Sequence, residues 1–340
     1  MKFKLSKIKK PFIIAELSAN HNGNINNIYR LIDNAKKCGA NAIKIQSYTA
    51  QSITLDCKNK YFYVNNGHWK GNYLYDIYNK GSLPFSWHKK VFNYAKKKNI
   101  LCFSSPFDSS AVQLLEKLKV KLYKVASFEI NHIPLLQEIG KTRKPVIVST
   151  GTASIKDIEL AIKTLKINGS NEIAILHCIS AYPSKPKNYN LNFINKLKKF
   201  NVPIGLSDHT IGNVVATTSV GMGVKIFEKH IKLDKKKGLD SEFSTNQNDF
   251  KNYVNAINLA FECMGKENFN RSILEKASIQ ARRSIFISKN VTKNEIITKD
   301  NIKVVRPSNG MHPKFFHKIL GKKFKMNKKK GVPLKLSHIL

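Results

Sequence analysis

The sequence predicts an α/β protein, a (β/α)8 TIM barrel followed by a small β-rich domain. Three observations lead to this prediction. Short apolar runs recur between Phe12 and Phe227, amphipathic helical patterns separate them, and the pattern changes after about Lys266. A chain of 340 residues is also long enough for about two domains, with a large core in the first.

The apolar runs have the character of buried parallel strands. They are rich in Ile, Val and Phe and continuous instead of alternating, which is typical of strands covered on both faces. They are, in chain order, Phe12–Ala15, Ala42–Ile45, Ile100–Phe103, Leu122–Ala126, Pro145–Val148, Ile173–Leu176, Pro203–Leu206 and Val224–Phe227. Eight strand–helix units over about 260 residues match the size of a barrel. An open doubly wound sheet is the main alternative, but no G-x-G-x-x-G or phosphate-loop motif supports it.

The connections between the runs read mostly as helices. The clearest amphipathic patterns are Asn27–Cys38, Ser109–Leu118 and Ile155–Leu165. The second connection, Tyr48–Pro84, is much longer and rich in aromatic residues. Because long loops in compact domains are usually functional, we interpret it as a flap that faces a substrate. A packing or oligomerisation element is the alternative.

The pattern after Lys266 predicts a second domain. A helical segment, Ser272–Gln280, leads into short strands and turns such as Val291–Ile297 and Ile302–Pro307. We therefore expect a barrel over residues 1–265, a linker over 266–281 and a β-rich domain over 282–340. A domain of about 60 residues has a small core. We therefore expect it to pack against the barrel of its own chain or of a partner chain.

Charge and cysteine content limit the class of protein. Lys and Arg number 59 against 22 Asp and Glu, a net charge of +37 that favours anionic partners. The lysines are scattered, and no nucleic-acid reader motif occurs, so we interpret most as solvated surface. Five cysteines without a C-x-x-C pair exclude a disulfide framework. No run approaches the roughly 18 apolar residues of a membrane helix. We expect a cytoplasmic protein that binds neither membrane nor nucleic acid.

Polar side chains end every predicted strand. The carboxyl ends of barrel strands meet at one rim, where such barrels carry their active sites. A single polar strand end can be a structural cap, but eight that converge predict a site for a polar ligand. In strand order they are Glu16; Lys44 and Gln46; Ser104 and Asp108; Lys124, Ser127 and Glu129; Ser149; His177 and Tyr182; Ser207, Asp208 and His209; Glu228, Lys229 and His230.

Taken together, these motifs resemble the sialic acid synthases, which condense phosphoenolpyruvate with an N-acetylated aldose. The resemblance spans essentially the whole chain, and the tail resembles that family's antifreeze-like (SAF) domain. Within the family the sequence is most similar to the pseudaminic acid synthase branch. The motifs that carry the resemblance are Glu16 with Asn20-His21-Asn22, Lys44-Ile45-Gln46, Trp69-Lys70-Gly71, Tyr123–Glu129, Ser149-Thr150-Gly151, Ser207–Thr210, Glu228-Lys229-His230, Asp240–Ser244, Arg282-Arg283-Ser284, Val305-Arg306-Pro307 and Gly310–Pro313.

The resemblance also implies roles for single residues. His209 and His230 would hold a divalent metal, Mn²⁺ or Mg²⁺, that polarises the sugar aldehyde. Arg306 would reach the barrel of the other subunit and contact an acetamido group, which implies a domain-swapped homodimer. Phosphoenolpyruvate would be bound by Lys44, Lys124, Ser127, Ser149 and Ser207, with Gln46 and Tyr182 as further ligand contacts. The catalytic carboxylates would be Glu16, Glu129 and Asp240, among which the general base stays open.

The expected reaction is an aldol-like condensation that releases phosphate by C–O cleavage. The implied sugar is 2,4-diacetamido-2,4,6-trideoxy-altropyranose (6-deoxy-AltdiNAc), and the product is a nine-carbon acid for flagellin or surface glycans. The same reaction on N-acetylmannosamine or on the legionaminic acid precursor is the nearest alternative. More distant alternatives are a Schiff-base aldolase using Lys44 or Lys124, a nucleic-acid-binding protein and a barrel without activity.

Overall fold

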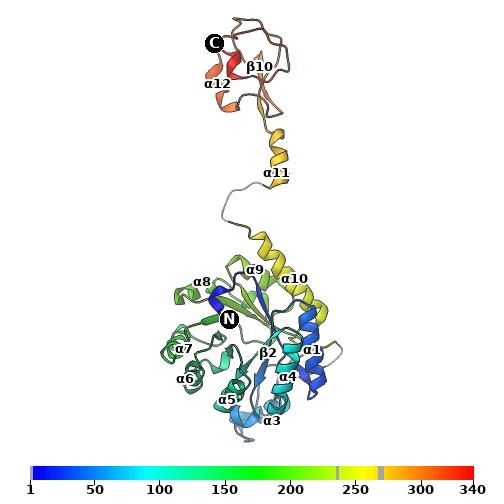
Figure 1. Cartoon of the computed structure of the whole chain (residues 1–340), viewed down its shortest axis with the longest axis vertical. Coiled ribbons are helices and arrows are strands. Elements are labelled where there is room, and N and C mark those ends of the chain that lie inside the picture. The colour runs from blue at the N-terminus through cyan, green and yellow to red at the C-terminus, as the bar shows by residue number, and fades with distance from the viewer. Residues whose placement is uncertain (1–2, 235–236, 267–271) are drawn as a thin grey trace. The chain divides into compact units, whose positions relative to one another are not determined.

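The computed structural model describes residues 3–234, 237–266 and 272–340 (Figure 1). The chain divides into two compact units, Met1–Gly265 and Lys266–Leu340. Each unit has its own hydrophobic core, because the apolar clusters of the described residues lie either before residue 265 or after residue 280. No described helix has the length and apolar character that a membrane crossing requires.

The first unit is a closed barrel of eight parallel strands in sequence order. Strand β1 closes it by pairing with β8, where Glu16 lies opposite His230. Every predicted strand is confirmed, and the open-sheet alternative is wrong. The strands are β1 (Phe12–Glu16), β2 (Ala42–Ser47), β3 (Leu101–Pro106), β4 (Tyr123–Val125), β5 (Val146–Ser149), β6 (Ile173–Cys178), β7 (Ile204–Asp208) and β8 (Ile226–His230).

Helices surround the barrel (Figure 1). Side-chain caps mark where several begin, as the Asp108 carboxylate accepts the Ala111 N–H at the start of α5. Their apolar faces pack on the outside of the strands in two large clusters. The helices are α1 (Ile25–Lys37), α2 (Ala50–Ile53), α3 (Leu74–Gly81), α4 (Phe85–Lys97), α5 (Ser109–Lys117), α6 (Ile133–Lys141), α7 (Ile155–Ile167), α8 (Phe193–Leu197), α9 (Val214–Gly221) and α10 (Gln247–Cys263).

The interior of the barrel is apolar towards the amino ends of the strands. Leu5, from the segment before β1, packs there against strand residues such as Ile14, Phe103 and Leu176. All four side chains are almost fully buried. Because this end is filled by side chains, a ligand has to enter from the carboxyl ends of the strands.

The second unit is β-rich, as predicted. Helix α11 (Ile273–Ser278) precedes an antiparallel pair, β9 (Ser284–Ile287) and β10 (Ile302–Val305), and α12 (Phe316–Ile319) follows. The expected strand at 291–297 forms only isolated bridges, through Val291 and Ile296. Part of the expected linker, residues 267–271, lies outside the described residues.

Candidate active site

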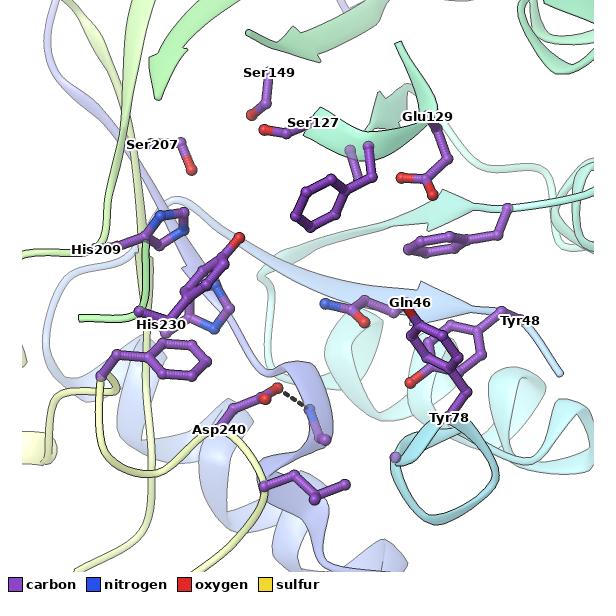
Figure 2. Close-up of a pocket in the computed structure, with 18 of the residues that line it drawn as sticks. Gln46, Tyr48, Tyr78, Ser127, Glu129, Ser149, Ser207, His209, His230 and Asp240 are labelled. Carbon is purple, nitrogen blue, oxygen red and sulfur yellow. Dashed lines mark hydrogen bonds between the residues drawn. The ribbon is translucent and has the colours of Figure 1, made fainter. Parts of the chain in front are cut away.

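A cavity of about 170 Å³ opens at the carboxyl ends of the strands (Figure 2). Of the 13 residues predicted for the site, it brings 11 together in its lining. Glu16 lies beneath the lining, and Arg306 belongs to the second unit, where it lines a pocket with Arg282, Arg283 and His312. The 11 are Lys44, Gln46, Lys124, Ser127, Glu129, Ser149, Tyr182, Ser207, His209, His230 and Asp240.

Two buried lysines form the charged floor of the cavity. The Lys44 Nζ lies 2.7 Å from Glu16 Oε2 and 3.5 Å from Glu228 Oε1. The Lys124 Nζ lies 3.6 Å from Glu228 Oε2. Burial lowers the pKa of Lys124, whereas for Lys44 burial is outweighed by the two carboxylates, which raise its pKa. Two ammonium groups in so small a volume form a strong site for an anion.

Glu228 is named among the polar strand ends in the sequence analysis, but it was given no role in the site. It is the antepenultimate residue of β8 and the shared partner of both lysines. Burial opposes its ionisation, but Lys124 and Lys44 outweigh that effect and lower its pKa. Its position at the end of the eighth predicted strand was the sequence feature that could have indicated a role in the site.

Three serine side chains, of Ser127, Ser149 and Ser207, lie near one another in the cavity wall (Figure 2). Ser149 Oγ is buried without a hydrogen-bond partner among the described residues. Ser127 Oγ and Ser207 Oγ make only long contacts, 3.5 Å to Cys178 Sγ and 3.4 Å to Glu228 Oε1. None of these contacts is to backbone, which disfavours a purely local capping role. The hydroxyls are therefore free to donate to a bound anion.

Two histidines lie beside this anion site, on neighbouring strand ends. Their ring centroids are 5.3 Å apart. His209 Nδ1 lies 2.9 Å from the Ile179 carbonyl, which assigns the proton to Nδ1 and leaves Nε2 as a free ligand atom. His230 Nδ1 is buried without a hydrogen-bond partner in the described part of the chain. Two imidazoles with unused nitrogen atoms fit a divalent metal whose other ligands come from substrate and water.

The described residues contain no group of three or more His, Cys, Asp or Glu arranged to hold a metal ion. Within the described part of the chain, the histidine pair is therefore not joined by a third such ligand. Such a pair leaves most coordination positions open, which is typical of a metal that binds substrate directly.

The three predicted carboxylates differ in environment. Both carboxylate oxygens of Glu16 already have partners in the protein. Its Oε1 accepts from the Ser18 N–H and the Gln46 side chain, and its Oε2 pairs with Lys44. Asp240 accepts the Ala19 N–H at 3.0 Å (Figure 2). Glu129 Oε2 has no partner among the described residues, and burial raises the pKa of Glu129 to about 7. Glu129 is thus the carboxyl best suited to proton transfer near neutral pH.

Aromatic rings form the walls above the histidines. Tyr182 packs on His209 at 4.4 Å and on Phe243 at 4.8 Å, and Trp69 from the long connection adjoins both Tyr182 and Phe243. The facing wall consists of Tyr48, Tyr78 and Phe107. The long connection 48–84 therefore faces the cavity.

Asp208, one of the polar strand ends named in the sequence analysis, does not line the cavity. Its carboxylate pairs with Lys229 at 3.1 Å and accepts from the Thr210 N–H and hydroxyl. Both charged side chains are fully buried. The pair lies on the face of the strands that is turned away from the cavity, because neighbouring residues of a strand point to opposite faces.

The fold and the site define a class: a (β/α)8-barrel enzyme with a cationic cavity at the carboxyl rim, beside a pair of imidazoles. The NeuB family model matches residues 31–269, and the SAF domain model matches residues 282–340. The chain belongs to the NeuB family.

Relatives support this assignment along almost the whole chain. A pseudaminic acid synthase of Campylobacter jejuni is 40% identical, over 97% of this chain and 96% of the relative. An N,N'-diacetyllegionaminic acid synthase of the same species is 34% identical, over 93% and 96%. The crystal structure of an N-acetylneuraminic acid synthetase from Leptospira borgpetersenii, in complex with citrate, superposes with a TM-score of 0.71 at 31% identity, over 82% of this chain and 95% of that one.

Proposed function

We propose that the protein is a pseudaminic acid synthase, which condenses phosphoenolpyruvate with 6-deoxy-AltdiNAc and releases phosphate. The observation that carries the proposal is the cavity, where two buried lysines and three serine hydroxyls lie beside an imidazole pair. The choice of sugar rests on the 40% identity to a relative of that name, against 34% for a legionaminic acid synthase.

The floor of the cavity suits phosphoenolpyruvate. Its phosphate and carboxylate can pair with Lys44 and Lys124, while Ser127, Ser149 and Ser207 donate hydrogen bonds. The Glu228 carboxylate partly neutralises the positive charge of the two ammonium groups before the ligand binds, because both groups lie within 3.6 Å of it. Glu16 fixes the position of Lys44 and of Gln46.

We propose that His209 and His230 hold a divalent metal, Mn²⁺ or Mg²⁺. Such an ion, when bound, supplies Lewis-acid polarisation of the sugar aldehyde oxygen. Tyr182 and Phe243 pack against the two rings and hold them in the cavity wall.

The reaction then needs one C–C bond and one C–O cleavage. C3 of phosphoenolpyruvate attacks the aldehyde carbon, water adds to C2, and the C2–O bond breaks so that phosphate leaves. Glu129 is placed to exchange a proton with the new hydroxyl or with the attacking water, since its pKa is about 7. Gln46 and Asp240 lie where they can bind the sugar's polar groups.

The remaining parts of the proposal follow the family resemblance. We propose that Arg306 contacts an acetamido group in the barrel of a partner chain, within a domain-swapped homodimer. The product would serve in flagellin or surface glycans. The N-acetylneuraminate and legionaminate reactions remain the alternatives, because they need the same floor and imidazole pair.

The test is phosphate release from phosphoenolpyruvate by the purified protein with Mn²⁺. We expect release with 6-deoxy-AltdiNAc, no release with N-acetylmannosamine or the legionaminic acid precursor, and loss of activity with a chelator. Phosphoenolpyruvate labelled with ¹⁸O at the bridging atom should yield labelled phosphate. Release with another sugar alone would move the assignment to that synthase, and unlabelled phosphate would contradict C–O cleavage.

A further inference from the structure

Helix α3 presents an apolar stripe to the cavity. Leu74, Ile77, Tyr78 and Gly81 are spaced i, i+3, i+4 and i+7, which places them on one helix face, and all four line the cavity. None of the three larger side chains belongs to an apolar core cluster of the described residues. Apolar groups at helical spacing usually face a core, so here the stripe faces the space for a ligand.

The stripe is held in place before any ligand binds. The carbonyl of Gly81 accepts from His21 Nε2 at 3.2 Å, which ties the end of α3 to the segment after β1. A Cβ at Gly81 would lie 3.0 Å from the Tyr48 hydroxyl, so the end of the helix packs closely against Tyr48. On the outer side, Gln51 donates to the Tyr75 hydroxyl at 2.6 Å. A preformed apolar surface of this kind can discriminate between ligands.

The stripe lies across the cavity from the reactive groups. Figure 2 shows Tyr78 and Tyr48 on one side of the cavity and His209 and His230 on the other. If the aldehyde carbon of the sugar lies at the histidines, the far end of the sugar reaches the stripe. Val64 and Phe107 extend the apolar lining at this side.

We propose that Leu74 and Ile77, with the Tyr78 ring, form an apolar subsite that selects a sugar with a methyl group at C6. This inference rests on the proposed function and assigns the specificity of the same site. A C6 hydroxyl placed against the Leu74 and Ile77 side chains would lose water without gaining a partner from them. A methyl group would bury apolar surface instead. An apolar subsite distinguishes such a pair by roughly 10- to 100-fold.

The experiment compares 6-deoxy-AltdiNAc with its 6-hydroxy counterpart. For the wild type we expect kcat/KM to favour the 6-deoxy sugar by at least about 10-fold. Ile77→Thr and Leu74→Gln should reduce that preference to below about threefold, with the KM for phosphoenolpyruvate changed less than about twofold. Leu55→Gln is the matched control, because Leu55 lies on the same connection but is 67% exposed and outside the cavity lining.

The outcomes separate the two proposals. A wild-type preference below about threefold, or variants that lose both sugars equally with the preference unchanged, would overturn this inference and leave the proposed function intact. A wild type that turns over only N-acetylmannosamine would overturn the proposed function, and this inference with it. Ile77→Thr is the smaller change, because Thr keeps the β-branch of Ile and has one fewer side-chain heavy atom, so it still tests the inference should Leu74→Gln fail to fold.

Discussion

The buried charged side chains at the strand ends of this barrel form two separate groups. Lys44, Lys124 and their carboxylates face the cavity, whereas Asp208 and Lys229 face away from it. Asp208 and Lys229 are register partners on β7 and β8, and each immediately precedes one of the two histidines. Their ion pair therefore joins the two strand ends from which the imidazole pair projects.

Removal of one partner of this outer pair should be costly. Asp208→Asn leaves the Lys229 ammonium group fully buried without a counter-charge, so we expect the free energy of unfolding to fall by about 3–5 kcal/mol. The double variant Asp208→Leu/Lys229→Met should lose less than the sum of the single variants. Urea unfolding of the three variants measures both effects. Additive losses would show that the pair is not coupled.

The raised pKa of Glu129 predicts a pH-dependent stability. Its pKa is about 7 in the folded protein, above the ordinary value of 4.5, so the folded state holds the proton more tightly. The stability from protonation is full below about pH 4.5 and is lost as the pH rises through 7. Glu129→Gln has no carboxyl group at this position, so its stability does not fall for this reason as the pH rises. We expect the Tm of the variant to gain on the wild type by roughly 2 to 6 °C between pH 5 and pH 8.

Differential scanning calorimetry of both ligand-free proteins across this pH range measures the difference. Glu295→Gln, at an exposed carboxyl of the second unit whose pKa is lowered, is the control and should show no such gain. A constant Tm difference for Glu129→Gln would contradict the raised pKa.

Among the elements, the long connection 48–84 supplies much of the apolar cavity lining. It contributes α3 and Trp69 to the lining, and a cluster of contacts fastens it to the segment after β8. His68 Nε2 lies 2.7 Å from the Leu239 carbonyl, its Nδ1 lies 2.9 Å from Glu242 Oε2, and Trp69 Nε1 donates to the same carbonyl. These contacts join two connections that are about 170 residues apart.

Loss of the His68 contacts should loosen the connection without disturbing the floor. For His68→Ala we expect the KM for the sugar to rise about 10-fold, while the KM for phosphoenolpyruvate changes less than about twofold. Limited proteolysis between residues 48 and 84 should also become faster. Asn65→Ala, an exposed position on the same connection, is the control. An equal rise in both KM values would mean that His68 supports the whole cavity.

At the scale of the whole molecule, two units with separate cores share one chain. The second unit has its own cluster around Ile285, Phe324 and Leu334. Arg306 belongs to this unit, whereas the other 12 predicted site residues belong to the first. The proposed role of Arg306 therefore requires the second unit of some chain to complete the cavity.

Complementation between two inactive variants tests the proposed swap. Lys124→Met removes a cation from the cavity floor and Arg306→Ala removes the proposed partner contact, so each alone should retain less than about a tenth of the activity. In a swapped homodimer, co-expression of both should restore about a quarter of the wild-type sites, because half of the dimers are mixed and each has one intact site. No recovery would show that the swap does not occur.

Much of this architecture is readable in the sequence. Runs such as Phe12–Ala15 and Ile173–Leu176 predict buried strands because covered parallel strands are continuously apolar, which is a local property. The polar residues that end those runs converge because a barrel brings all its carboxyl ends to one rim. The Leu74–Tyr78 spacing is local too, but it cannot say whether the stripe meets a core or a cavity.

The sequence by itself determined the eight strands, the second β-rich unit and most of the charged and hydroxyl-bearing residues of the cavity floor, since each depends on neighbours in the chain. Only the tertiary structure decided that Glu228 serves both lysines, that Asp208 turns away from the cavity and that α3 faces it. These features depend on strand register and on packing between segments far apart in the chain. A shift of one residue along a strand moves a side chain from the cavity to the opposite face.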